Sequence, residues 1–254
     1  MLPYIIPMIP DHRVYVEPFA GGAALFWGKK PSKIEVLGDI NGEVSNFYRV
    51  MKLDFHALCQ EIESTLHCEF TFNKAKSIYK NPSEYSDLER AWAFWVCANM
   101  SFGGEVGGSF QWVRHFSDNW HPAVFISNRR KEFQYYESRL DQVTIRTIKA
   151  EELIPKIDGI DVFYYLDPPY INARQGHYSG YSEDDYISLL NSIEGIKGHF
   201  ILSSYPNEIL TEYALRNGWK QKEIDMYRGV QNGRKTEVLA WNYNIKTARN
   251  LTLF

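Results

Sequence analysis

Apolar positions in the first 50 residues alternate between the spacing of a strand and that of a helix. Arg13 to Glu17 (RVYVE) alternates and is rich in β-branched and aromatic side chains, which predicts a strand. Proline and glycine interrupt it at Pro18 to Gly22, and residues 23–29 are typical of a short helix. Residues 34–37 predict a second strand, and residues 41–53 carry a helical apolar pattern. A strand-helix-strand unit of this kind opens a doubly wound α/β domain.

The pattern changes between residues 52 and 143. Phe55 to Leu66 and Leu88 to Met100 have the spacing of amphipathic helices. A glycine-rich stretch at Ser101 to Gly108 (SFGGEVGG) suits a hairpin or loop, and polar, basic sequence follows it. No clear signal for a parallel strand occurs here. We therefore predict an inserted, mainly helical lobe over residues 52–143, within an α/β domain formed by residues 1–51 and 144–254.

The α/β pattern returns after the insert. Its predicted strands and helices alternate along the chain: strands at 143–148, 161–166, 199–203 and 237–243, and helices at 151–156, 184–193 and 208–217. Asp161 to Leu166 (DVFYYL) is strongly apolar, as a strand buried on both faces should be. The fold class expected is therefore α/β with a parallel sheet.

Bulk composition excludes little. The chain of 254 residues has 44% apolar residues, enough for a core, and its net charge of −3 argues neither for nor against binding to nucleic acid. Cys59, Cys68 and Cys97 are far apart, which favours a reducing, intracellular setting, and the seven histidines show no metal-ligand spacing. No apolar run approaches the roughly 18 residues that span a bilayer. We expect a soluble, cytoplasmic protein without a metal or a membrane partner.

Two motifs near the start of the chain suggest a cofactor with an adenosine-like half. Glu17-Pro18-Phe19-Ala20-Gly21-Gly22 places adjacent glycines between a strand and a helix, where the backbone can approach a ligand closely. Asp39-Ile40-Asn41 follows the second strand, about 20 residues later, and its carboxylate can accept hydrogen bonds from ribose hydroxyls. A plain turn plus a helix cap at Asp39 explains these two motifs equally well. The turn is not GxGxxG, which argues against a nicotinamide or flavin cofactor.

A third motif, Asp167-Pro168-Pro169-Tyr170, directly follows the apolar strand. Two prolines remove two N–H donors, so nearby carbonyl groups can accept hydrogen bonds from a substrate. Asp167 adds a carboxylate acceptor, and Tyr170 adds a flat ring for stacking. An exocyclic amine on a base drawn out of a duplex needs two acceptors and a stacking partner. The motif therefore predicts a site for such an amine.

In their order along the chain, EPFAGG, DIN, a long insert, YLDPPY and LSSYPNE resemble the Dam-like class of DNA adenine-N6 methyltransferases. The resemblance covers nearly the whole chain. It implies a Rossmann-like methyltransferase sheet, an inserted target-recognition domain over residues 52–143, and S-adenosylmethionine as the methyl donor, leaving S-adenosylhomocysteine. The expected activity is methylation of a flipped-out adenine at a specific site in double-stranded DNA.

The resemblance also implies roles for individual residues. Asp167 and the Pro168 carbonyl hold the target amine, with Pro169 and Tyr170 completing the catalytic loop and Tyr170 stacking on the adenine. Asp39 holds the ribose hydroxyls and Ile40 lies against the cofactor adenine. The remaining residues expected at the cofactor, with Phe19, Gly21 and Gly22 on its methionine side, are Glu17, Pro18, Phe19, Ala20, Gly21, Gly22, Asn41 and Asp167.

Partners are expected as well. Phe102 and Gly104 belong to the predicted DNA-facing loop of the insert, and Arg114, Arg129 and Arg130 are candidate DNA contacts, with plain solvation as the alternative for each arginine. We expect a monomer, and a cognate restriction endonuclease as partner if the protein belongs to a restriction-modification system.

Two departures from the family pattern keep alternatives open. Family members carry a Gly-Gly-Lys segment just before the stretch matched here by Leu2 to Ile5, and Lys149 stands where an acidic residue commonly binds the cofactor adenine. One alternative is therefore a degenerate DNA-binding protein without activity. The other is an amine methyltransferase that acts on cytosine N4 or on RNA, because the same pair of acceptors serves any exocyclic amine.

Overall fold

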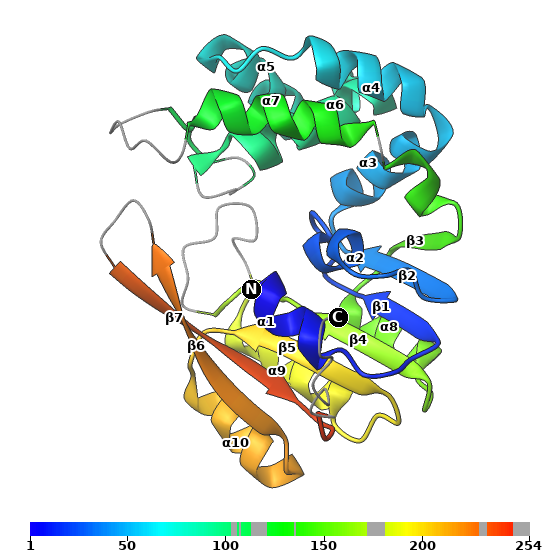
Figure 1. Ribbon diagram of the computed structural model, residues 1–254, viewed down its shortest axis with the longest axis vertical. Coiled ribbons are helices and arrows are strands. Elements are labelled where there is room, and N and C mark those ends of the chain that lie inside the picture. Colours follow the sequence, from blue (N-terminus) through cyan, green and yellow to red (C-terminus); the bar gives the residue numbers. More distant parts are fainter. Residues whose placement is uncertain are drawn as a thin grey trace, which may run out of the picture. The chain divides into compact units, whose positions relative to one another are not determined.

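The computed structural model describes residues 1–102, 106, 108–112, 121–134, 136–171, 181–228 and 233–245. The chain divides into two compact units (Figure 1). Among the described residues, the first unit contains 1–40, 148–171, 181–228 and 233–245, and the second contains those between Asn41 and Thr147. The division by function predicted from the sequence, with boundaries after residues 51 and 143, stays a prediction.

The chain forms a seven-stranded sheet with the order β3-β2-β1-β4-β5-β7-β6 (Figure 1). β2, β1, β4 and β5 run parallel to one another, whereas β7 pairs antiparallel with both β5 and β6. The strands are β1 (Val14–Glu17), β2 (Ile34–Asp39), β3 (Val143–Thr147), β4 (Val162–Leu166), β5 (His199–Ser204), β6 (Lys220–Arg228) and β7 (Gly233–Trp241). A parallel sheet of this order is the doubly wound arrangement, with β7 placed between β5 and β6. The predicted α/β class with a Rossmann-like sheet is confirmed.

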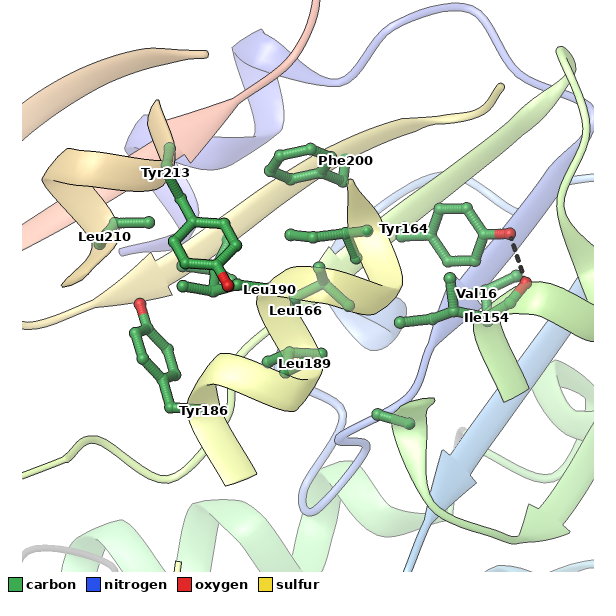
Figure 2. Close-up of a cluster of buried hydrophobic side chains, with 14 of the residues drawn as sticks. Val16, Ile154, Tyr164, Leu166, Tyr186, Leu189, Leu190, Phe200, Leu210 and Tyr213 are labelled. Carbon is green, nitrogen blue, oxygen red and sulfur yellow. Dashed lines mark hydrogen bonds between the residues drawn. The ribbon is translucent and has the colours of Figure 1, made fainter. Parts of the chain in front are cut away.

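Helices of the first unit cover the sheet. They are α1 (Leu2–Ile5), η1 (Ile6–Met8), α2 (Ala24–Gly28), α8 (Ala150–Ile157), α9 (Glu183–Ile193) and α10 (Glu208–Asn217). Side chains from α8, α9 and α10 pack with alternate residues of the central strands into one apolar core (Figure 2). In that core the hydroxyl of Tyr164 donates to the carbonyl of Ile154 over 3.2 Å. Tyr15 and Phe163 point to the opposite face, since successive side chains of a strand alternate, and their ring centroids lie 6.0 Å apart.

The second unit is mainly helical. Its helices are α3 (Gly42–Leu53), α4 (Phe55–Ser64), α5 (Glu69–Lys80), η2 (Pro82–Glu84), α6 (Asp87–Met100), α7 (Pro122–Phe133) and η4 (Glu137–Leu140). α6 is its central helix, since Ala91 to Cys97 are all buried, as the all-round apolar sequence requires. A capping box fixes the start of α6: the Ser86 hydroxyl accepts from the Glu89 N–H, and the Glu89 carboxylate accepts from the Ser86 N–H.

Besides the short 3-10 helices, four elements were absent from the sequence prediction, namely α1, α5, α7 and β6. α7 lies in the stretch that the sequence analysis interpreted as polar and basic. It was not predicted because its apolar residues form no continuous stripe along the helix. β6 is an edge strand that carries charges at Lys220, Lys222, Glu223 and Asp225, a common protection of a sheet edge and a weak strand signal. No helix among the described residues is both long and apolar enough to cross a membrane.

Candidate active site

The predicted motifs meet where the strand order of the sheet reverses. β1 and β4 are neighbours, β2 continues the sheet beyond β1, and β5 continues it on the other side of β4. In open α/β sheets, ligands bind at such a switch point, beside the carboxyl ends of the strands. EPFAGG begins with Glu17, the last residue of β1, and DPPY directly follows β4. The topology therefore brings both motifs to the same end of adjacent strands.

Left-handed backbone at two positions shapes the glycine turn. Gly21 has φ of 44° and Ala23 has φ of 47°, a conformation in which a glycine is less strained than an alanine. The Ala20 N–H donates to the Gly38 carbonyl and the Gly21 N–H donates to Asp39 Oδ2, both over 2.9 Å. A Cβ built on Gly22 would meet no atom within 4 Å, so the turn has open space at that position.

The end of β2 presents three residues in different ways. Asp39 is buried and held by the Gly21 N–H, whereas the side chain of Ile40 is 57% exposed. Asn41 is the N-cap of α3: its Oδ1 accepts from the Glu43 N–H over 3.0 Å, and its Nδ2 donates to the Tyr79 hydroxyl over 2.9 Å. The cap considered at the sequence level is thus Asn41 rather than Asp39.

The DPPY segment directly follows the buried strand β4, and the first residue of the segment is exposed to solvent. Asp167 is exposed, Pro168 and Pro169 are buried, and Tyr170 is partly buried. The Tyr170 hydroxyl donates to Asp167 Oδ1 over 3.1 Å. Its ring meets that of Tyr205, which follows β5, edge-on with 4.5 Å between centroids. Burial and the charges of Asp167 and Glu237 raise the pKa of Tyr170, so this hydroxyl stays protonated and remains a donor.

Acidic side chains gather around this end of the sheet. Glu17 is buried at the end of β1, and the Tyr15 hydroxyl donates to its Oε2 over 2.6 Å. Burial chiefly, with the nearby charge of Asp167, raises the pKa of Glu17 to about 8. Glu237 on β7 is 5% exposed, and its charge, with those of Asp167 and Glu17, contributes to a raised pKa of Tyr165, which is mainly due to burial. Within the described part of the chain, no group of three or more His, Cys, Asp or Glu side chains could hold a metal ion.

Two residues near these motifs were not singled out in the sequence. Glu237 lies 3.5 Å from the Tyr170 hydroxyl at its Oε2, and Tyr181 packs edge-on against Phe19 with 6.4 Å between ring centroids. A single glutamate inside the apolar run EVLAW of β7 was the only available signal for the first. Tyr181 carries no motif, so the sequence offered no signal for the second.

The candidate DNA contacts belong to the second unit. Phe102 is 38% exposed, and its N–H donates to the Ser109 carbonyl over 2.8 Å. Arg129 pairs with Glu132 over 3.2 Å and lies over the Phe125 ring. Arg130 donates to the carbonyls of Glu63 and Thr65 over 3.1 and 2.8 Å, which links α7 to the end of α4. Gly104 and Arg114 lie outside the described residues.

Comparison with known proteins agrees with the chemistry that this geometry suggests. Three curated relatives are type II methyltransferases: M1.LlaDCHI of Lactococcus lactis subsp. cremoris is 25% identical over 96% of this chain and 91% of its own length. M.CviBI of Paramecium bursaria Chlorella virus NC1A is 23% identical over 83% of each chain. M.MjaIII of Methanocaldococcus jannaschii is 26% identical over 69% of this chain and 66% of its own length.

A family model matches residues 1–228. The family is described as adenine-specific DNA methyltransferases that act on N6. This favours adenine N6 over cytosine N4 and DNA over RNA as the target, and it favours an enzyme over an inactive DNA-binding protein. Its reaction requires a methyl donor and a DNA substrate. The chain belongs to the D12 class of N6 adenine-specific DNA methyltransferases.

Proposed function

We propose that this enzyme transfers the methyl group of S-adenosylmethionine to N6 of an adenine flipped out of double-stranded DNA, with Asp167 to Tyr170 as the catalytic loop. The observation that carries the proposal is the placement of DPPY beside the glycine turn, at the switch point of the sheet. Residues 1–51 and 144–254 would form the catalytic domain, and residues 52–143 the target-recognition domain.

The residues around the turn suit this cofactor. When bound, S-adenosylmethionine supplies a methyl group on a positively charged sulfonium. The carboxylate of Asp167, whose charge acts on Glu17 at the end of β1, favours such a cation over an anionic ligand. A carboxylate has about four acceptor positions, so Asp39 can hold the Gly21 N–H and still accept from ribose hydroxyls.

The surface at the turn is compatible with a flat, partly apolar ligand. Ile40 exposes an aliphatic side chain beside Asp39, and Gly22 leaves room for close approach. Pro18, Phe19 and Ala20 complete the proposed wall of the site. Asn41 would contribute to the site by fixing the backbone after β2, since it is the N-cap of α3, and also by contacting the cofactor.

The amine of adenine is a poor nucleophile because its lone pair is delocalised into the ring. Asp167 and the carbonyl of Pro168 would each accept one N–H of this amine, which favours a tetrahedral nitrogen and directs its lone pair at the methyl carbon. Stacking on Tyr170 would hold the plane of the base. Positioning and preorganised acceptors then lower the barrier, and no covalent enzyme intermediate is needed.

The biological setting is proposed from the relatives. Since the curated relatives are named type II methyltransferases, a cognate restriction endonuclease is the expected functional partner. We propose that the enzyme acts as a monomer. Phe102, Gly104, Arg114, Arg129 and Arg130 remain the proposed DNA contacts of the target-recognition domain.

Incubation with methyl-labelled S-adenosylmethionine and unmethylated DNA, followed by digestion to nucleosides, tests the proposal. Label is expected in N6-methyladenine, and the same assay with Asp167→Ala is expected to show none. Label in N4-methylcytosine, or equal labelling by Asp167→Ala, would overturn it. Cofactor binding measured in parallel separates an inactive binder, which would retain DNA affinity and bind no cofactor.

A further inference from the structure

The hydroxyl of Tyr170 lies between two carboxylates. It donates to Asp167 Oδ1 over 3.1 Å, and Glu237 Oε2 lies 3.5 Å away. Asp167 and Tyr170 belong to the same loop after β4, whereas Glu237 comes from β7, 67 residues later. Because β5 separates β4 from β7 in the sheet, this contact reaches across a whole strand.

A phenol hydroxyl has one proton and donates it fully to one acceptor at a time. The shorter distance assigns that proton to Asp167 in this structure. In the proposed reaction, however, Asp167 must accept a hydrogen from the target amine. A hydrogen bond from the Tyr170 hydroxyl reduces the negative charge on the Asp167 carboxylate. Asp167 is then a weaker acceptor for the N–H of the target amine.

We infer that Glu237 is a positioning residue, which takes over the hydroxyl of Tyr170 when the target amine reaches Asp167 and so keeps the ring of Tyr170 fixed for stacking. This inference rests on the proposed function. Glu237 touches neither the base nor the cofactor in this scheme, and it acts through Tyr170 alone. The transfer needs a movement of a few tenths of an ångström, since 3.5 Å is long for a hydrogen bond between two oxygens.

The cost of a buried carboxylate supports a specific role for Glu237. The side chain is 5% exposed, at the point of β7 where the polar residues end and the apolar residues Val238 to Trp241 begin, in a neighbourhood that already holds Glu17 and Asp167. Burying a further negative charge there is unfavourable, and an apolar residue would fit the strand at lower free energy. Tyr205 packs edge-on against Tyr170, so the ring is held from the side while the carboxylates hold its hydroxyl.

A double-mutant cycle of Glu237→Gln and Tyr170→Phe tests the inference, with kcat/KM for methylation of duplex DNA as the readout. Tyr170→Phe keeps the ring and removes only the hydroxyl, and Glu237→Gln keeps the shape and removes the charge. Each single change is expected to lower kcat/KM about tenfold, the usual effect of one hydrogen bond to a charged group. Glu237→Gln in the Tyr170→Phe background is expected to cost less than about a factor of two.

Glu223→Gln is the matched control, because Glu223 is an exposed glutamate on β6, paired in register with Val238 beside Glu237. It is expected to leave kcat/KM unchanged in both backgrounds. Cofactor affinity of the Glu237→Gln protein is expected to match the wild type. Its unfolding temperature is expected to be equal or higher, because the change removes a buried charge, whereas a purely structural role of the charge would lower it.

Three results would overturn the inference. Factors that multiply in the double variant would mean that Glu237 acts independently of the Tyr170 hydroxyl, and wild-type activity of Tyr170→Phe would mean that the hydroxyl has no role. In both cases the wild-type enzyme still methylates adenine, so the proposed function stands. A wild-type protein without methyltransferase activity would remove the proposed function and this inference together.

Discussion

The backbone N–H of Gly21 donates to the carboxylate of Asp39 over 2.9 Å, across 18 residues of sequence. β1 and β2 are parallel and in register, with Glu17 opposite Leu37, so the residues that follow them leave the sheet side by side. The glycine turn and the acidic residue after β2 therefore form one structure, in which Asp39 orients the turn that it also faces. A change at Asp39 should act on both parts of the proposed cofactor site.

Asp39→Asn is expected to weaken S-adenosylmethionine binding about tenfold. The amide keeps the shape of the side chain but accepts hydrogen bonds as a neutral group, which makes each bond weaker than one to a carboxylate. Calorimetric titration of the purified variant with the cofactor gives the Kd directly.

Asp158→Asn is the control for this experiment. The Asp158 carboxylate also accepts backbone N–H groups, those of Lys197 and Gly198 over 3.0 Å, but it precedes β4 and lies away from the carboxyl ends of the strands. It is expected to leave the cofactor Kd unchanged. Equal weakening by both variants would mean that Asp39 acts only through general stability.

Asp167→Ala is expected to abolish methyl transfer while the fold persists. Asp167 is exposed, so its removal leaves no buried cavity. Asp161→Ala, an equally exposed aspartate at the opposite end of β4, is expected to retain wild-type turnover. Single-turnover kinetics compare the two variants. More than about a tenth of wild-type kcat in Asp167→Ala, ~1.4 kcal/mol of barrier, would contradict the catalytic assignment.

The strands that carry these motifs could be predicted from the sequence because their patterns are strong. The predictions for residues 13–17, 161–166 and 199–203 agree with β1, β4 and β5 to within a residue at each end. Parallel strands buried on both faces give continuous apolar runs, and the turns after β1 and β4 carry glycine or proline. Local sequence therefore located the two loops that chemistry requires.

Relations between distant parts of the chain could not be predicted in this way. Glu237 is one glutamate beside the apolar end of β7, and only the pairing of β7 with β5 brings it to Tyr170. Arg130 shows the same limit, since the sequence places it in a basic cluster, and only the fold shows that its guanidinium donates to carbonyls at the end of α4. Spacing along the chain reports which face of an element is apolar, and it does not report which side chains meet after folding.

Glu17 should make stability depend on pH. Burial raises its pKa from the ordinary 4.5 to about 8, so between these values the folded chain holds a proton that the unfolded chain has lost. Stability from this group is therefore full below about pH 4.5 and is lost as pH rises to about 8. Glu17→Gln has no proton to lose. The difference in free energy of unfolding, wild type minus Glu17→Gln, is expected to fall by about 1.4 kcal/mol per pH unit within this window.

Urea unfolding at pH 5, 6.5 and 8 measures this difference, with Glu212→Gln as the control. Glu212 is an exposed residue of α10, so its replacement should change stability by the same small amount at each pH. A difference for Glu17→Gln that is constant across the three pH values would show that the carboxyl of Glu17 titrates normally.

The ion pair between Lys29 and Glu35 should be a point of structural weakness if one partner is removed. Both side chains are 3% exposed, their charged atoms are 2.6 Å apart, and Lys29 also lies over the ring of Tyr15. Lys29→Met leaves the charge of Glu35 buried without its cation. The free energy of unfolding is expected to fall by about 3–5 kcal/mol, and Lys29→Met with Glu35→Gln is expected to recover at least half of this loss.

The exposed pair of Arg216 and Glu194 provides the comparison. Their side chains are 47% and 34% exposed, and their atoms are 2.9 Å apart, so Arg216→Met is expected to lower the free energy of unfolding far less than Lys29→Met does. Denaturant unfolding of the wild type and the three variants at one pH gives all of these values. If Lys29→Met costs no more than Arg216→Met, water reaches Glu35 in solution, and the pair is not buried in the sense that the structure indicates. If the double variant recovers nothing, the loss comes from the packing of the lysine stem against Tyr15 rather than from the uncompensated charge.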